Sequence, residues 1–239
     1  MCRIVDGQMA RTIDTNKPAG QALPPIPGGW TTEDVPVSGK TFRLTSPADP
    51  DAFLDESEVL AAHKRDGFMP YWPYLWPAAQ SLAEAVIRGK WPAGTRALEI
   101  GCGIGLVGLA ALSRGLCVTL SDYEPLAVEL AAYNALQNGF DRFERLILDW
   151  RSPLPQRFSL ILACDVIYET RNHVPILDLI ETMLAVGGSC WIGDPGRSHT
   201  DEFIQLAQRG GFVVRLCDSA SNRYLSVQIG QYRQIVLTR

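Results

Sequence analysis

The fold is decided by the run Leu98-Glu99-Ile100-Gly101-Cys102-Gly103-Ile104-Gly105-Leu106-Val107-Gly108. Its apolar start predicts a buried strand, and its glycines lie where that strand must turn sharply into a helix. A loop without side chains lets a ligand approach the backbone, and the free N–H groups of the helix N-terminus then point at that ligand. Read from Gly103, the run also matches the G-x-G-x-x-G pattern of dinucleotide-binding folds. A purely structural tight turn is the third interpretation.

From residue 95 onward, short β-rich runs alternate with helical ones, which indicates a parallel sheet with helices on both faces. The expected strands are residues 96–100, 117–121, 145–148, 160–164, 189–192 and 212–217. The expected helices are residues 105–113, 125–137, 173–184 and 200–208. Strands at 224–229 and 232–237 are predicted to close the chain as a hairpin. The predicted fold is α/β: a doubly wound, mostly parallel Rossmann-like sheet with a C-terminal antiparallel hairpin strand and an N-terminal extension.

The part of the chain before this sheet has a different character. Residues 1–37 carry five prolines among polar residues and glycines, without a period of 3.6 or 2, and are predicted to be a flexible tail. Residues 38–94 are predicted to be an N-terminal extension with a short strand, a capped helix that begins at Pro50-Asp51, and a first helix over residues 80–87. Residues 95–239 are the predicted main domain.

Composition narrows the class of protein. Twenty-two basic and 26 acidic residues among 239 give a net charge of −4, which favours a small ligand or a protein partner over nucleic acid. The six cysteines form no C-x-x-C pair, and His63, His173 and His199 lie far apart, so no metal site is expected. No run reaches the roughly 18 apolar residues of a membrane span. We expect a cytoplasmic protein that is a monomer or a weak dimer.

Acidic residues follow successive predicted strands. Glu99 stands two residues before Gly101 and favours a cationic ligand over a pyrophosphate. Asp122 ends the second strand, where a carboxylate can accept hydrogen bonds from ribose hydroxyls. It could also cap the following helix, and Glu124 could bind the ribose instead. Asp149-Trp150 follows the third strand and suits an adenine amino group and ring face, although the tryptophan could equally pack in the core.

In this order, the motifs resemble the class I S-adenosylmethionine-dependent methyltransferases over residues 70–239. The resemblance rests on E-x-G-x-G-x-G at residues 99–105, the acid after the second strand, L-D-W at 148–150 and the strand region 158–168. D-x-x-Y at 165–168 and Leu75-Trp76-Pro77 resemble the family 16 methyltransferases, many of which modify protein lysines. Pro70-Tyr71-Trp72 and the turn at 193–197 resemble the branch that includes the electron-transfer flavoprotein β-subunit lysine methyltransferase.

The resemblance implies an S-adenosylmethionine-dependent N-methyltransferase of the EC 2.1.1 type, with S-adenosylhomocysteine as product and a protein lysine as acceptor. A small-molecule amine or heterocycle acceptor stays open, as does a catalytically silent fold that binds the nucleoside or a partner. The implied cofactor-binding residues are Trp76, Glu99, Gly101, Cys102, Gly103, Gly105, Asp122, Tyr123, Asp149, Trp150 and Cys164.

Methyl transfer from a sulfonium needs alignment and exclusion of water, and a lysine acceptor must also be held neutral. The fourth and fifth strands end on one edge of the sheet, so the predicted catalytic residues are Asp165, Tyr168 and Arg197. The tyrosine could instead be a core phenol, and the arginine could pair with Asp194 as a structural clip. The aromatic run at residues 71–76 could form a lid, a wall for an ammonium group, or a hydrophobic plug.

Overall fold

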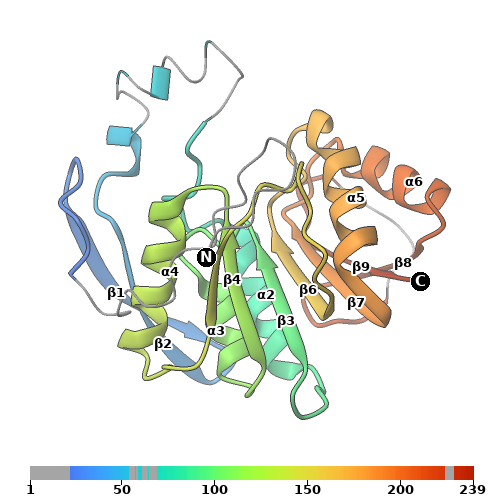
Figure 1. The fold of residues 1–239 in the computed structure, drawn as a ribbon, viewed down its shortest axis with the longest axis horizontal. Helices are drawn as coiled ribbons and strands as arrows, with labels where there is room; N and C mark the ends of the chain where they lie inside the picture. The colour runs from blue at the N-terminus through green and yellow to red at the C-terminus, as the bar shows by residue number, and fades with distance from the viewer. Residues whose placement is uncertain (1–21, 54–56, 58, 61–63, 65–68, 224–228) are drawn as a thin grey trace.

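A computed structural model describes residues 22–239 except 54–56, 58, 61–63, 65–68 and 224–228. Its main feature is a seven-stranded sheet with helices on both faces (Figure 1). In sheet order the strands are β5 (Glu144–Ile147), β4 (Cys117–Asp122), β3 (Arg96–Ile100), β6 (Phe158–Cys164), β7 (Leu184–Asp194), β9 (Arg233–Thr238) and β8 (Val213–Cys217). Of these, β9 runs antiparallel to its neighbours β7 and β8. The predicted doubly wound α/β sheet with an antiparallel C-terminal strand is confirmed.

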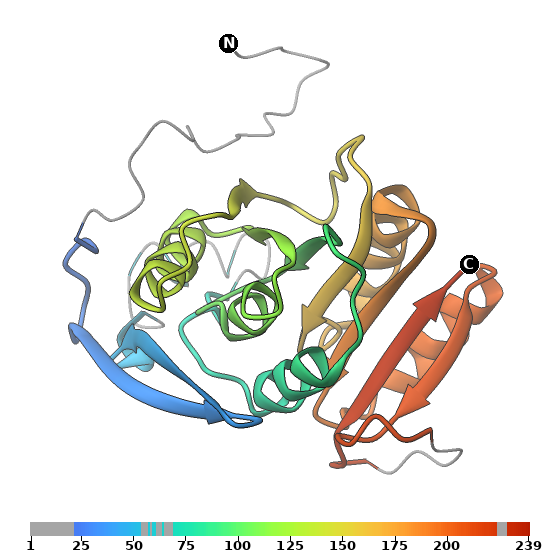
Figure 2. The ribbon, with the colours of Figure 1, turned by 90° about the horizontal axis from the view of Figure 1, so that it is seen from below.

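The helices lie in two layers. They are α2 (Pro77–Arg88), α3 (Leu106–Leu112), α4 (Pro125–Gln137), α5 (His173–Met183) and α6 (Thr200–Arg209), with the short 3-10 helices η1 (Pro50–Phe53) and η2 (Thr170–Asn172). Helices α2, α3 and α4 share one core cluster, and α5 and α6 share the cluster on the other face of the sheet (Figure 2). Both α2 and α4 begin with proline. The backbone N–H of the first residue of a helix makes no hydrogen bond within the helix, so proline, which lacks this group, is tolerated there.

Strand β6 shows how the two clusters meet the sheet. Leu160 and Leu162 pack in the cluster with α2, α3 and α4, whereas Ile161 and Ala163 pack in the cluster with α5 and α6. Successive side chains of a strand point to opposite faces, so a strand covered on both sides is apolar at nearly every position. The first polar residues after this run therefore reach the carboxyl edge of the sheet.

The structure corrects part of the predicted tail. Strand β1 (Trp30–Val37) pairs antiparallel with β2 (Lys40–Pro47), and this hairpin packs against α2 and α4 (Figure 2). The prediction of a tail over residues 1–37 is wrong for β1, and residues 1–21 lie outside the described part of the chain. Val35 and Val37 are buried, but the rest of β1 is exposed or half-buried, so the sequence shows too short an alternation to predict a strand.

Two other predictions fall partly outside the described residues. The helix predicted from Pro50 begins as η1, and residues 54–56 and 58 of its continuation lie outside that part. The strand predicted at 224–229 also lies outside it, except for Ile229, which is in a turn. The division of the chain at residue 95 stays a prediction. Within the described ranges, no helix has the length and apolar character needed to cross a membrane.

Candidate functional site

A cavity of about 300 Å³ opens at the carboxyl ends of β3, β4 and β6. At this edge the strand order reverses, and open α/β sheets bind ligands at such a point. Most of the site residues expected from the sequence line it: Trp76, Glu99, Gly101, Cys102, Gly103, Asp122, Tyr123, Asp149, Trp150, Cys164, Asp165 and Tyr168. Gly105 and Arg197 are not part of the lining, and Glu124, the alternative ribose-binding residue, is.

The glycine loop after β3 is held by the carboxylate of Asp122. The Gly103 nitrogen donates to Oδ2 of Asp122 (N···O 3.0 Å), and the Glu124 nitrogen donates to Oδ1 (3.0 Å). Burial raises the pKa of Asp122, and these backbone N–H groups oppose the rise. Each carboxylate oxygen can accept a second hydrogen bond, so this carboxylate can bind a hydroxyl group while it fixes the loop.

Gly105 lies behind the loop, which differs from its predicted place in the cofactor site. Its φ is +89°, and a Cβ atom there would lie 2.8 Å from the Cβ of Ala131 on α4. Only a residue without a side chain allows this conformation and this approach together. Gly105 therefore packs the loop against α4, and Gly101 and Gly103 face the cavity.

Glu99 places a buried carboxyl group at the cavity. Glu99 is 3% exposed. Among the residues that the structure describes, none makes a hydrogen bond of good geometry to its Oε2 atom. Burial raises the pKa of Glu99 to about 8, and the charge of Asp122 acts in the same direction, while the Gly108 N–H opposes them. A buried carboxyl with unused acceptor capacity suits a cationic donor from a ligand.

Glu124 is a half-buried carboxyl group that also lines the cavity. Burial raises its pKa to about 7, and the neighbouring charge of Asp122 adds to the rise. By contrast, the walls contributed by Cys102 and Cys164 are neutral, because burial raises the pKa of both thiols well above the ordinary value. No cluster of three or more metal-ligating side chains occurs among the described residues.

Asp149 is engaged by an arginine that sequence reasoning missed. Both of its carboxylate oxygens accept hydrogen bonds from Arg151, at 2.8 Å from Nε and 2.8 Å from Nη2. The Arg151 guanidinium also lies 5.5 Å from the ring centre of Tyr123. Trp150 is half-buried; it packs against the core cluster and also lines the cavity. The sequence does contain a signal for this pair, because Arg151 stands two positions after Asp149, the carboxylate predicted to bind the ligand.

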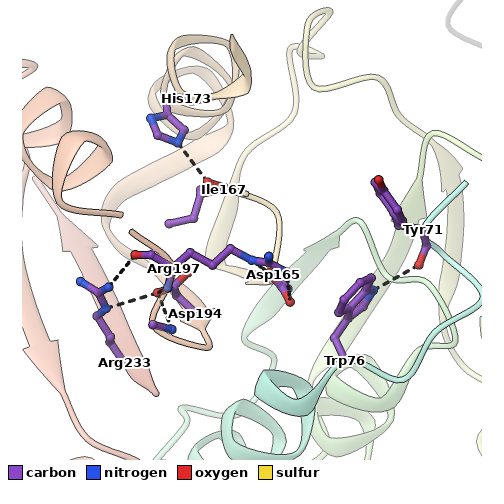
Figure 3. Close-up of polar contacts among 9 residues, drawn as sticks. Tyr71, Trp76, Asp165, Ile167, His173, Asp194, Arg197 and Arg233 are labelled. Atoms are coloured by element: carbon purple, nitrogen blue, oxygen red, sulfur yellow. Dashed lines mark hydrogen bonds and ion pairs between the residues drawn. The ribbon is translucent and has the colours of Figure 1, made fainter. Parts of the chain in front are cut away.

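Across the cavity, Asp165 and Arg197 form a partly buried ion pair (Figure 3). Nε of Arg197 donates to Oδ1 of Asp165 at 2.6 Å, and Nη2 donates to Oδ2 at 2.9 Å. Asp165 has a φ of +54°, and its nitrogen donates to the Gly193 carbonyl oxygen at 2.8 Å. The backbone therefore aims this carboxylate at the turn after β7, from which Arg197 reaches back.

The predicted clip between Asp194 and Arg197 is wrong for their side chains. Asp194 Oδ1 instead accepts hydrogen bonds from the backbone nitrogens of Gly196 (2.9 Å) and Arg197 (3.2 Å). Its charge partner is Arg233 on β9, whose Nε lies 3.3 Å from Oδ1. Arg233 is 1% exposed and also donates from Nη2 to the Arg197 carbonyl oxygen at 2.8 Å (Figure 3). This buried pair fixes the turn that carries Arg197.

Aromatic rings complete this side of the cavity. The rings of Tyr71 and Tyr168 meet edge to face with centres 5.5 Å apart. Trp76 Nε1 donates to the Tyr71 carbonyl oxygen at 3.1 Å (Figure 3). The Arg197 guanidinium lies 5.6 Å from the ring centre of Trp76 and 5.7 Å from that of Tyr168. Ring faces directed at a cation form a wall suited to positive charge, which argues against a purely hydrophobic plug.

His173 supports the loop between Asp165 and Tyr168. Its Nε2 donates to the Ile167 carbonyl oxygen at 3.0 Å, since a carbonyl can only accept (Figure 3). The imidazole is fully buried and meets the ring of Phe203 edge to face. This histidine therefore fixes the shape of the loop from outside the cavity.

Comparison with known proteins gives a family and several individual similarities. Residues 73–209 match a family model described as lysine methyltransferase. The chain is 29% identical over 136 residues to the electron transfer flavoprotein beta subunit lysine methyltransferase of Danio rerio. The aligned part covers 56% of this chain and 53% of that protein. It is 33% identical over 162 residues to the protein N-lysine methyltransferase METTL21A of Danio rerio, over 64% of this chain and 74% of that protein.

A further relative is the histidine protein methyltransferase 1 homolog of Dictyostelium discoideum, at 29% identity over 60% of this chain and 48% of that protein. The chain thus spans about half the length of the first curated relatives it matches. A crystal structure of a TehB-like SAM-dependent methyltransferase from Corynebacterium glutamicum superposes with a TM-score of 0.56 at 20% identity, over 80% of this chain and 100% of that one. That similarity shows the fold.

Proposed function

The chain belongs to the lysine methyltransferase family, and on that premise we propose that it transfers a methyl group from S-adenosylmethionine to a lysine side chain of a protein. The observation that carries the proposal is the cavity itself, which joins two different chemical surfaces. One end has a glycine loop with buried carboxyl groups, and the other has aromatic rings and Asp165, whose carboxylate pairs with Arg197 just behind the lining. The first suits a nucleoside with a cationic tail, and the second suits an amine.

The residues present fit S-adenosylmethionine, which supplies an activated methyl group when bound. Glu99 offers a buried acceptor for the amino group, since its Oε2 atom has no hydrogen bond of good geometry to any of the residues that the structure describes. Asp122 and Glu124 both line the cavity and can accept hydrogen bonds from the ribose hydroxyls. Trp150 and Tyr123 supply ring faces for the adenine. The thiols Cys102 and Cys164 and the indole of Trp76 form the remaining predicted wall.

On the acceptor side, the ion pair sets what Asp165 can do. Both of its oxygens accept hydrogen bonds from Arg197, so this carboxylate is engaged by the guanidinium. We therefore assign Asp165 the role of holding Arg197 in place. A fixed guanidinium beside an incoming lysine lowers the pKa of the ammonium group and so favours the neutral amine. The aromatic rings exclude water from the same place.

Tyr168 supplies a protonated hydroxyl to this end of the cavity. Burial raises its pKa above the ordinary range, so the phenol keeps its proton at neutral pH. A phenol can donate one hydrogen bond and accept others, which suits it to orient an amine. The net charge of −4 supports a protein acceptor over nucleic acid. Because one relative is named as a histidine methyltransferase, the test must identify the methylated side chain.

Calorimetry with S-adenosylhomocysteine tests the cofactor half of the proposal. The wild-type chain is expected to bind it, and Asp122→Ala is expected to bind it at least about tenfold more weakly, a loss of about 1.4 kcal/mol. Asp178→Ala is the matched control, since Asp178 is an exposed carboxylate on α5 outside the cavity lining. Binding of NADH without binding of S-adenosylhomocysteine would refute the proposal in favour of a dinucleotide site.

A further inference from the structure

A buried amide joins the N-terminal hairpin to the helix behind the glycine loop. Asn134 lies on α4 and is 0% exposed. Its Oδ1 accepts a hydrogen bond from the Thr45 nitrogen of β2 at 2.8 Å, and its Nδ2 donates to the Thr45 carbonyl oxygen at 2.9 Å. The side chain thus pairs with β2 in the way that a neighbouring strand would, and it ties the hairpin to α4.

The same amide reaches the glycine loop. Nδ2 of Asn134 also donates to the Ile104 carbonyl oxygen at 2.9 Å. Ile104 lies between Gly103 and Gly105 and is part of the cavity lining. Both amide hydrogens of Asn134 are therefore used, one on the hairpin and one on the loop. On its other side the loop is held by the bond from the Gly103 nitrogen to the Asp122 carboxylate.

Asn138 offers a natural comparison one helical turn further along. Its Oδ1 accepts from the Arg43 nitrogen at 2.9 Å, and its Nδ2 donates to the Arg43 carbonyl oxygen at 2.8 Å, so it makes the same pairing with β2. Its other bond runs to the Asn134 carbonyl oxygen at 2.8 Å, within α4. Asn134 and Asn138 thus make the same pair of hydrogen bonds to β2; they differ in contact with the glycine loop and in burial, since Asn138 is half-buried.

We infer that Asn134 is a positioning residue that couples docking of the β1–β2 hairpin to cofactor binding at the glycine loop. The inference rests on the proposed function, because it takes the loop to bind S-adenosylmethionine. Coupling between two sites is reciprocal. Loss of the hydrogen bonds from Asn134 to the hairpin and the loop therefore lowers the affinity for the ligand, and bound ligand in turn stabilises the docked hairpin. The hairpin lies before residue 73, where the match to the family model begins, so this coupling involves a part of the chain that the match does not include.

Paired variants separate this role from general support of the fold. S-adenosylhomocysteine is titrated calorimetrically into Asn134→Ala and Asn138→Ala, at a temperature at which circular dichroism shows both to be folded. Asn134→Ala is expected to weaken binding by about tenfold, within the range of measured couplings, and Asn138→Ala by less than about twofold. Equal losses in the two variants, or no loss in Asn134→Ala, would overturn the inference.

Amide hydrogen exchange decides the matter even where a variant does not fold. In the wild-type chain, S-adenosylhomocysteine should slow exchange in β2 more than in β8, an edge strand that likewise supplies no residue to the cavity lining. Equal slowing in both strands would show general stabilisation and would contradict the coupling. Should the wild-type chain bind no S-adenosylhomocysteine, the proposed function fails. In that case the exchange rates of the Gly103 and Gly105 amides, measured without ligand, still test whether Asn134 positions the glycine loop. Exchange should be faster than in the wild type for Asn134→Ala and unchanged for Asn138→Ala.

Discussion

Replacing Glu99 by glutamine should remove most of the rise in S-adenosylhomocysteine affinity between pH 7 and 8. Burial raises the pKa of this carboxyl to about 8, so at pH 7 about one molecule in ten carries the ionised form. The ammonium group of the ligand favours that ionised form, because an opposite charge nearby lowers a carboxyl pKa. Binding at pH 7 is therefore expected to release close to one proton.

The size of the effect follows from the ionised fraction. That fraction rises from about one tenth at pH 7 to about one half at pH 8, so the wild-type affinity should increase by about fivefold over this interval. Glu99→Gln, which is nearly the same size and carries no titrating proton, should bind more weakly and with no such rise. Glu202→Gln, an exposed carboxyl on α6, is the control and should retain the wild-type profile.

Titration calorimetry in two buffers with different ionisation enthalpies measures both the affinity and the number of protons released. The free protein gives a second readout. A carboxyl whose pKa is raised by folding binds more protons in the folded than in the unfolded state between about pH 4.5 and 8, so its contribution to stability falls as the pH rises through that window. The free energy of unfolding of Glu99→Gln should therefore fall less than that of the wild type as the pH rises through this window. A wild-type affinity that is flat from pH 6.5 to 8 would refute the reasoning.

Three other variants test other parts of the structure. Tyr168→Phe should lower kcat while the Kd for S-adenosylhomocysteine stays within a few-fold, because the hydroxyl acts on the acceptor; a parallel loss of binding would contradict this. Phe42→Ala should lower the free energy of unfolding in urea by about 3 kcal/mol, since Phe42 is 3% exposed in the hairpin core; a near-neutral effect would show that the hairpin adds no stability. Gly105→Ala should lower the Tm more than Gly115→Ala, since both have positive φ but a Cβ at Gly105 alone of the two meets Ala131. Equal changes in Tm would show that this close approach does not matter.

The sequence predicts well where the pattern is local. Helix α4 has the predicted bounds, because Pro125 marks its start and an apolar face runs through it. Strand β3 also has its predicted bounds, since the glycines that follow it fix its end. The cavity lining was largely predictable for the same reason, because acids that follow parallel strands must meet at one edge of the sheet.

The sequence does not predict partners that depend on long-range packing. Arg197 lies three residues from Asp194, yet its side chain pairs with Asp165, 32 positions away. Arg233 is a single basic residue in an apolar strand, and only the antiparallel pairing of β9 with β7 brings it to Asp194. Asn134 likewise looks like an ordinary polar helix residue until the hairpin docks against α4.

Transfer of a labelled methyl group tests the central claim most directly. The chain is incubated with methyl-labelled S-adenosylmethionine and a protein extract freed of small molecules, with Tyr168→Phe in parallel, and labelled proteins are digested and analysed by mass spectrometry. We expect label on a discrete protein, on the nitrogen of a lysine side chain, and much less of it with Tyr168→Phe. Label on a histidine, label that appears only when the small-molecule fraction is restored, or no transfer by the wild-type chain would contradict the account.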